Sequence, residues 1–489
     1  MRTHPHLYEI SAWPWLERLS SRSGRRVTLI DVPGAEWDAI AATGMDVVYL
    51  MGVWQRSAVG RTLARTDLAL LGEYDRALPG WSMDDVPGSP YSIQAYQPEA
   101  RMGGWAGVDA ARAALAARGM RLLLDFIPNH LGFDHAWIGA HPERFVQGTL
   151  DDYRAAPELF RPIESPDGRT LRFIACGRDP FLPPWRDVAQ LNLFNPETRE
   201  ALVGELAAIA RHCDGVRCDM AMLALNDVFA RTWSERVDLL WRQPEREFWP
   251  DATARVPMIY LAEVYWDREY QLQQQGFHFT YDKRLLDRLR HGDAGRVRGH
   301  LQADPAYSAR LARFLENHDE ARSADALDGR VRAAVVLTFT LPGLRFFFDG
   351  QFAGAAVRAP VQLGRWAPEP DRPEIRELYA RVLQALRDPL FHDGSWSLLD
   401  VRNAGDGTHG NLIASAWRLD RQLAVIAVNL SGRESHGFLD IGHLPPGDAF
   451  DLVDALTAAR YHRTRADLEN GLYVGLNAGD AHLLLLEGD

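Results

Sequence analysis

Cysteine is scarce in this sequence: only three of the 489 residues are Cys. They are Cys176, Cys213 and Cys218, which are too few and too irregularly spaced for a disulfide framework or a zinc site. We interpret them as buried free thiols.

An excess of positive charge and long apolar runs are also absent. The formal net charge is −12, so the chain lacks the basic surface that nucleic acid requires, and an anionic membrane would repel it. No stretch approaches the length of a membrane span, and residues 1–6 contain no apolar segment typical of a secretory signal. We therefore expect a cytoplasmic protein with a neutral substrate and with no nucleic-acid or membrane partner. The oligomeric state is left open.

Hydrophobic residues make up 46% of the chain, which supports a sizeable core in one large domain plus a small one. The sequence also contains 15 Trp. Aromatic faces often pack against sugar rings, but most Trp residues fill protein cores, so this number alone decides nothing.

Helical and strand patterns alternate through most of the chain. Residues 108–118 form an amphipathic helical pattern stopped by Gly119, and the apolar run at 122–124 follows it. A second predicted strand covers 215–218. Six further predicted strands are at 7–10, 47–50, 258–262, 278–281, 313–315 and 344–348. Eight strands separated by helices predict a closed (β/α)8 TIM barrel of the α/β class.

Two regions depart from this alternation. After the third strand, residues 131–193 are rich in Pro, Gly, Asp and aromatics without sustained helical periodicity, and a loop of this length is usually functional. Near the end, short apolar segments such as 423–430 alternate with Gly, Asn and Asp, which indicates a small antiparallel β-sandwich. We predict a barrel domain at 1–393, with its insertion at about 131–193, and a C-terminal domain at 394–489.

Four carboxylates each follow a predicted buried strand. They are Asp125 in DFIPNH, Asp219 in GVRCDMAM, Glu263 in LAEVYW and Asp319 in FLENHDE. Loops at the carboxyl ends of barrel strands build the active site, so these acids are expected to converge. Any one alone would fit a helix cap or a surface acid better, but four together favour a shared site.

The neighbours of these acids suggest unlike roles. Arg217 is two residues before Asp219, so both side chains face the same way on a strand, and the guanidinium would keep the carboxylate ionised, as a nucleophile requires. A structural ion pair is the alternative. The apolar and aromatic flanks of Glu263 would raise its pKa towards that of a general acid. Two carboxyl groups in unlike environments are what cleavage of a glycosidic bond requires.

In this order, the four segments resemble conserved regions I to IV of the α-amylase superfamily, glycoside hydrolase family 13, and the resemblance spans nearly the whole chain. It implies that Asp219 is the nucleophile, Glu263 the general acid/base and Asp319 an acid that binds substrate hydroxyls. Four further residues would line the same sugar subsite: Tyr91, His130, Arg217 and His318. The resemblance also identifies the insertion with the family's domain B and the tail with its C-terminal β-domain.

Some positions depart from the family pattern. Many α-amylases carry a Lys-His pair three and four residues after the nucleophile, and here these positions are Met222 and Leu223. A short oligosaccharide or a transfer reaction is therefore favoured over hydrolysis of starch. Asn129 corresponds to a calcium ligand of many relatives, so a structural calcium ion is left open, whereas the chemistry itself requires no cofactor.

The resemblance implies a retaining enzyme that hydrolyses α-glucosidic bonds of malto-oligosaccharides or related short α-glucosides by double displacement. A transglycosylase or a disaccharide-modifying enzyme would use the same covalent glycosyl intermediate, and the sequence does not separate them. Two other classes stay open: a barrel enzyme whose acids hold a divalent metal, which Arg217 disfavours, and a non-catalytic carbohydrate-binding barrel, although no catalytic carboxylate is missing.

Overall fold

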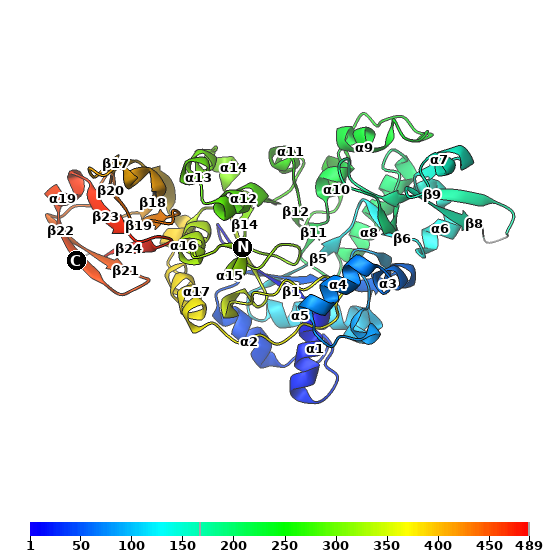
Figure 1. Ribbon diagram of the computed structural model, residues 1–489, viewed down its shortest axis with the longest axis horizontal. Coiled ribbons are helices and arrows are strands. Elements are labelled where there is room, and N and C mark those ends of the chain that lie inside the picture. Colours follow the sequence, from blue (N-terminus) through cyan, green and yellow to red (C-terminus); the bar gives the residue numbers. More distant parts are fainter. Residues whose placement is uncertain (166–167, 488–489) are drawn as a thin grey trace.

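Eight parallel strands close into a barrel at the centre of the molecule (Figure 1). The computed structural model describes residues 1–165 and 168–487. In order around the ring, the strands are β1 (His6–Ser11), β2 (Val47–Met51), β5 (Arg121–Phe126), β11 (Gly215–Cys218), β12 (Ile259–Ala262), β13 (Phe279–Tyr281), β14 (Leu311–Arg313) and β15 (Leu344–Phe348). The predicted barrel is confirmed.

The seventh strand lies earlier in the chain than the sequence predicts. The prediction was 313–315, but β14 pairs with its neighbours through Leu311 to Arg313. Phe314 and Leu315 are fully buried without joining the ladder. Hydrophobicity therefore identifies the buried segment correctly but places its hydrogen-bonded residues too late by two positions.

Helices connect the strands and surround the barrel. The predicted helix at 108–118 is α5 (Gly104–Ala116). Asn195 caps α8 (Pro196–Ile209) by accepting a hydrogen bond from the Glu197 backbone N–H at 2.9 Å. The remaining helices before the C-terminal sheets are α1 (Ala12–Ser23), α2 (Gly34–Ala42), α3 (Ala58–Ala64), α4 (Leu68–Ala77), α6 (Ala136–Ala140), α7 (Leu150–Ala155), α9 (Asn226–Trp233), α10 (Phe248–Arg255), α11 (Glu269–Gln274), α12 (Lys283–His291), α13 (Ala294–Leu301), α14 (Pro305–Ser308), α15 (Ser323–Ala326), α16 (Val331–Thr340), α17 (Pro373–Ala385) and α18 (Leu390–Asp393). None of the helices that the structure describes is both long and apolar enough to cross a membrane.

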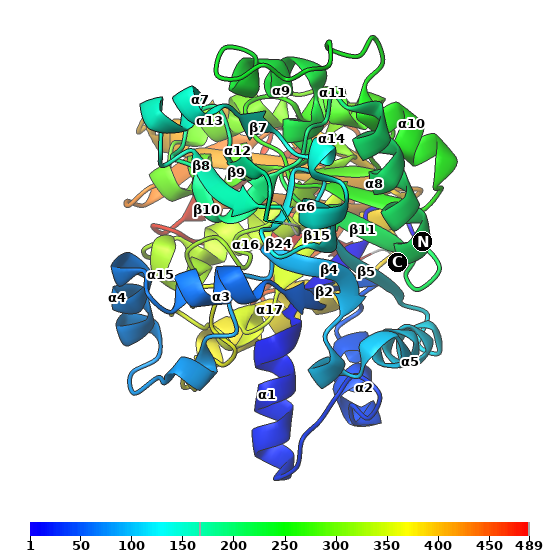
Figure 2. The ribbon, with the colours of Figure 1, turned by 90° about the vertical axis from the view of Figure 1, so that its right-hand side faces the viewer.

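The insertion after β5 forms an antiparallel sheet rather than an irregular loop. Its strands are β6 (His130–Gly132), β7 (Gln147–Gly148), β8 (Phe160–Glu164), β9 (Leu171–Gly177) and β10 (Trp185–Gln190). Figure 2 shows this region in front of the barrel, with the C-terminal sheets behind it. A smaller pair, β3 (Trp54–Arg56) and β4 (Ile93–Pro98), follows β2.

The C-terminal region contains two antiparallel sheets. One comprises β16 (Ser395–Leu399), β18 (Leu412–Leu419), β19 (Gln422–Asn429), β24 (Ala481–Glu487), β21 (Ala449–Asp454) and β22 (Arg460–Thr464), and the other β17 (Val401–Asn403), β20 (Ser435–Leu439) and β23 (Leu472–Leu476); α19 (Arg465–Glu469) follows β22. Alternate residues of β19 belong to two cores. Leu423 and Val425 pack in the cluster shared by the two sheets, whereas Ala424 and Ile426 pack in the main core with the barrel. Because both faces are buried, β19 is a continuous apolar run in the sequence.

Candidate active site

Two of the predicted acids share one guanidinium at the carboxyl end of the barrel. In the parallel ladder, Cys218 of β11 is aligned with Ala262 of β12, so the next residues, Asp219 and Glu263, lie at the same level. Arg217 Nη1 donates to Asp219 Oδ1 at 2.8 Å, and Arg217 Nη2 lies 2.7 Å from Glu263 Oε2. The strand register therefore makes the two carboxyl groups neighbours, and the ion pair with Arg217 is real.

Asp319 lies on the open side of this cluster. It follows β14, its side chain is 44% exposed, and its Oδ2 lies 2.9 Å from His318 Nε2. His318 Nε2 also lies 2.7 Å from the Tyr91 hydroxyl, and the Tyr91 and His318 rings stack with centroids 5.4 Å apart. The Arg217 guanidinium carbon lies 5.2 Å from the centre of the Tyr91 ring. Tyr91 and His318 thus join the cluster of Arg217 and the acids.

The structure places His130 at the cluster as well, but gives Asp125 a different role. His130 Nε2 lies 4.0 Å from Asp219 Oδ2. Asp125 is completely buried, accepts hydrogen bonds from the Gly52 backbone N–H at 2.7 Å and from the Tyr49 hydroxyl, and so holds the turn after β2. Asp125 is therefore neither a helix cap nor a surface acid but a buried residue of β5, aligned with Arg217 of β11.

Burial and neighbouring charges separate the proton affinities of the acids. Burial raises the pKa of Glu263 from 4.5 to about 7 against the opposing charge of Arg217, with a further rise from Asp219 and Asp319. Burial also raises the pKa of Asp219, and Arg217 opposes it through both charge and a hydrogen bond. The partial burial of Asp319, whose side chain is 44% exposed, acts in the same direction, but His318 and then Arg217 outweigh it and lower the pKa of Asp319 to about 2. At neutral pH, Asp319 is ionised while Glu263 retains much of its proton.

The two histidines carry different charges. Burial lowers the pKa of His130 to about 3, so its ring is neutral. Burial would do the same to His318, but Asp319 and Glu9 raise its pKa well above 6.5. Glu9 lies in β1, is completely buried and hydrogen-bonds to His318 Nδ1. His318 is therefore a cation held between two carboxylates.

Three residues that the sequence analysis did not single out also contact this cluster: Tyr265, Met220 and Glu9. Tyr265 donates from its hydroxyl to Glu263 Oε1 at 2.8 Å, and the Met220 backbone N–H donates to Glu263 Oε2 at 2.7 Å. Met220 has a φ of 42°, a left-handed conformation that is uncommon for a residue other than glycine. Glu9 had a signal in the sequence, an acid inside a predicted apolar strand, whereas the backbone donor had none.

The positions of the missing Lys-His pair turn inward. Met222 and Leu223 lie in a single 3-10 turn (Ala221–Ala224) and are buried. Beyond Glu263, the rings of Phe181 and Trp266 meet edge to face at 4.9 Å, and Phe181 is exposed. Trp266 comes three residues after Glu263, so this pair of rings belongs in part to the same segment after β12.

Asn129, the predicted calcium ligand, is paired with a neighbouring side-chain amide. Asn129 Oδ1 accepts a hydrogen bond from Gln190 Nε2 at 2.9 Å, and its own Nδ2 donates to Gln190 Oε1 at 3.3 Å. In the region of the chain that the structure describes, no group of three or more His, Cys, Asp or Glu side chains could hold a metal ion. Calcium binding stays a prediction without support from this geometry.

Comparisons with known proteins give partial matches in sequence and full-length matches in fold. No protein-family model matches the chain. It is 25% identical over 347 residues to α-amylase MalA of Haloarcula japonica, covering 69% of this chain and 46% of that protein. It is 22% identical over 259 residues to α-amylase 3 of Dictyoglomus thermophilum, covering 48% of each. The chain thus spans about half the length of these relatives.

Among solved structures, the noncanonic maltogenic α-amylase AmyB from Thermotoga neapolitana matches with a TM-score of 0.69 and 17% identity, covering 99% of this chain and 98% of that one. The α-amylase GTA from Geobacillus thermoleovorans, solved with acarbose, matches with a TM-score of 0.68 and 18% identity over the whole of both chains. These likenesses show the fold. Together with the matches in sequence, they confirm the resemblance to the α-amylase superfamily.

Proposed function

We propose that this protein is an enzyme that cleaves α-glucosidic bonds of malto-oligosaccharides or related short α-glucosides with retention of anomeric configuration. The observation that supports this most directly is the Arg217 guanidinium shared by Asp219 and Glu263. It keeps two carboxyl groups of unlike environment side by side, as a retaining glycosidase requires. The named activities of the two α-amylase relatives point the same way.

In the first step, Asp219 attacks the anomeric carbon while Glu263 gives its proton to the departing glycosidic oxygen. The bond to the leaving group breaks and an ester forms between the sugar and Asp219. In the second step, the Glu263 carboxylate removes a proton from water, which displaces Asp219 from the sugar. Two inversions restore the original configuration. None of these steps needs a cofactor.

The remaining site residues would hold the sugar. Asp319 is ionised and exposed, so it can accept hydrogen bonds from sugar hydroxyls. The Tyr91 ring offers an apolar face for stacking. His130 is neutral and can accept as well as donate, whereas the cationic His318 only donates.

A transferase is the second candidate, and the Phe181 and Trp266 rings favour it. Trp266 follows Glu263 by three residues in the segment after β12, and Phe181 packs against it. A leaving group departs and an acceptor enters at Glu263, and aromatic rings bind sugar acceptors by stacking. An acceptor sugar seated there would compete with water for the covalent intermediate.

The test is turnover by the parent protein and by Asp219→Asn. Both are incubated with maltose, maltotriose, isomaltose, trehalose, sucrose and starch, and the products are separated by chromatography. We expect the parent to convert at least one of these glucosides, the variant to lose activity by about 1,000-fold or more, and its circular dichroism to be unchanged.

Asp251→Asn, which removes an exposed acid of α10, is the matched control and should retain activity. An undiminished rate in Asp219→Asn would remove the assignment of the nucleophile. Binding of malto-oligosaccharides by the parent without any turnover would favour a non-catalytic carbohydrate-binding barrel. Products longer than the substrate would identify a transferase.

A further inference from the structure

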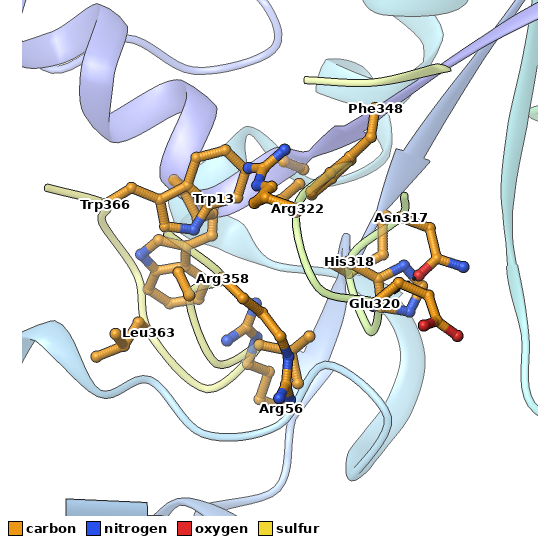
Figure 3. Close-up of a pocket in the computed structure, with 16 residues that line it drawn as sticks. Trp13, Arg56, Asn317, His318, Glu320, Arg322, Phe348, Arg358, Leu363 and Trp366 are labelled. Atoms are coloured by element: carbon orange, nitrogen blue, oxygen red, sulfur yellow. Dashed lines mark hydrogen bonds between the residues drawn. The ribbon is translucent and has the colours of Figure 1, made fainter. Parts of the chain in front are cut away.

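A narrow cavity opens beside His318 at the carboxyl end of the barrel (Figure 3). Its walls come from the segments that follow β2, β1, β15 and β14, which are consecutive around the ring. The side chains that matter here are Trp13, Arg56, His318, Arg358 and Trp366. Glu263 follows β12, which is four strands from β1 in either direction. The cavity and Glu263 therefore lie on opposite sides of the site.

Two arginines in this cavity form no ion pair with any described residue. Arg56 is only 8% exposed, and its Nη1 donates to the Gly88 carbonyl at 2.6 Å, but its buried Nε has no hydrogen-bond partner among the described residues. Within the same described chain, Arg358 makes no hydrogen bond or ion pair and is exposed. Figure 3 shows the two side chains converging at one end of the cavity. The nearest acids act on the two arginines only at a distance: Glu99 and Asp125 favour the charge on Arg56, and Arg358 helps to lower the pKa of Asp319. The buried Arg56 Nε is therefore a donor that a ligand could satisfy.

The other charges around the cavity are already paired. Arg322 Nη1 binds Glu316 Oε1 at 2.8 Å, and Glu320 binds Arg290 at 2.6 Å and Lys283 at 3.3 Å. His318 is held by Glu9 and Asp319. Arg56 and Arg358 are thus the two cationic side chains of the described cavity lining that no ion pair engages.

The local backbone and an indole ring hold Arg56 in place. Glu99 accepts from the Arg56 backbone N–H at 3.1 Å and not from its guanidinium. The Arg56 guanidinium carbon lies 4.8 Å from the centre of the Trp13 ring. A guanidinium positioned in this way is suited to paired hydrogen bonds with a phosphate or a carboxylate.

We propose that Arg56 and Arg358 form an oxyanion subsite, so that the substrate is an α-glucoside whose retained sugar carries a phosphate ester or a uronate carboxylate. The inference rests on the proposed function, because it takes the leaving group to depart at Glu263. Arg56 and Arg358 lie on the side opposite Glu263. An anionic group that reaches them therefore belongs to the sugar that becomes attached to Asp219, and not to the leaving group. This proposal differs from the neutral substrate that we expected from the net charge of −12, because the total charge of a chain does not determine the charge around one cavity.

The first test compares kcat/KM for 4-nitrophenyl α-glucoside, its 4- and 6-phosphates and 4-nitrophenyl α-glucuronide. We expect one anionic substrate to exceed the neutral one by about 10-fold or more, since charge-assisted hydrogen bonds contribute about 10- to 100-fold each. Arg358→Gln should lower this ratio by a similar factor. The phosphate and uronate substrates distinguish the two sources of negative charge.

Arg101→Gln is the matched control. Arg101 lies over the same Trp13 ring, at 4.6 Å, but it is paired with Glu17 and does not line the cavity. Its loss should leave the ratio of anionic to neutral turnover unchanged. A parent protein that turns over the neutral glucoside as well as every anionic one would overturn the proposal.

The second test measures binding without turnover, by calorimetry on Asp219→Asn. The ligands are glucose, glucose 4-phosphate, glucose 6-phosphate, glucuronate and inorganic phosphate. We expect one sugar oxyanion to bind at least about 10-fold more tightly than glucose and inorganic phosphate, and Arg56→Gln in this background to remove the difference. If Arg56→Gln does not fold, Arg358→Gln, at an exposed position, takes its place.

The two proposals fail in different ways. Selective binding of a sugar oxyanion with no turnover of any glycoside would contradict the proposed function and support the oxyanion subsite. Turnover of a neutral glucoside without selective binding would support the function and overturn the subsite. Equal binding of inorganic phosphate would overturn the assignment to the substrate.

Discussion

Proton affinity distinguishes the residues of the candidate site from one another. Burial raises the pKa of Glu263 to about 7, although this residue contacts the Arg217 guanidinium. In contrast, His318 holds the pKa of Asp319 at about 2. The chemistry of a general acid needs the protonated form of Glu263. The rate of glycoside cleavage should therefore be highest below pH 7 and fall as the pH rises through about 7.

Tyr265→Phe tests the environment of Glu263. The Tyr265 hydroxyl donates to Glu263 Oε1 and so favours the ionised carboxylate. Its removal should raise the pKa of Glu263 and move the alkaline limb of kcat/KM to higher pH by about 1 unit. Tyr270→Phe, at an exposed tyrosine of α11, is the control and should leave the profile in place. A limb that moves to lower pH in Tyr265→Phe would contradict this account.

At the scale of single elements, Asp282 joins three of them. Its Oδ1 accepts from the Leu285 backbone N–H at 3.1 Å and caps α12, and its Oδ2 binds Arg313 of β14 and lies 2.9 Å from His300 Nε2 of α13. Burial would raise the pKa of Asp282, but Arg313 and His300 lower it to about 2. The folded pKa is below the unfolded value of 3.8, so this stabilisation is present above pH 4 and is lost as the pH falls towards 2.

Asp282→Asn should destabilise the protein by about 3–5 kcal/mol at pH 7, because it leaves Arg313 buried without a counter-charge. Urea unfolding at pH 7 and at pH 3 measures this, and the difference from the parent should shrink at the lower pH. Asp287→Asn removes a half-exposed acid of the same helix that pairs with Lys283, and should cost about 1 kcal/mol or less. Equal effects of the two substitutions would refute the special position of Asp282.

For the whole molecule, the six-stranded sheet is attached to the barrel through a buried face. Trp417 of β18 is completely buried, and its Nε1 donates to the Thr340 carbonyl of α16 at 2.6 Å. Trp417→Ala should destabilise the protein by about 3–5 kcal/mol and lower the thermal midpoint. Tyr473→Ala, on the half-exposed face of β23, should change stability by about 1 kcal/mol or less. A thermal midpoint unchanged in Trp417→Ala would show that the sheet does not depend on this contact.

Calcium gives a second prediction for the whole molecule. Asn129 is paired with Gln190, so we expect exhaustive chelation followed by dialysis to leave both the thermal midpoint and the activity unchanged. Differential scanning calorimetry with and without added calcium measures this. A midpoint that rises with calcium concentration would show that the protein binds calcium and would contradict this prediction.

Most of the barrel and the positions of the acids could be predicted from the chain, since strands buried on both faces are contiguous apolar runs and the acids stand at their ends. The insertion was harder to interpret. Its strands are short and paired with distant segments, as β6 is with β10, so no local period marks them. The partners of the acids were also hidden, because Glu9 and His318 are 309 residues apart.

The sequence by itself determined the barrel, the order of its acids and the ion pair of Arg217 with Asp219, since these follow from hydrophobic runs and from side-chain alternation along one strand. Only the tertiary structure decided that Glu263 shares that arginine, that Glu9 and Asp319 keep His318 charged, and that Arg56 and Arg358 meet in one cavity. Such contacts depend on how the closed ring of strands brings separate loops together, and distance along the chain does not encode that closure.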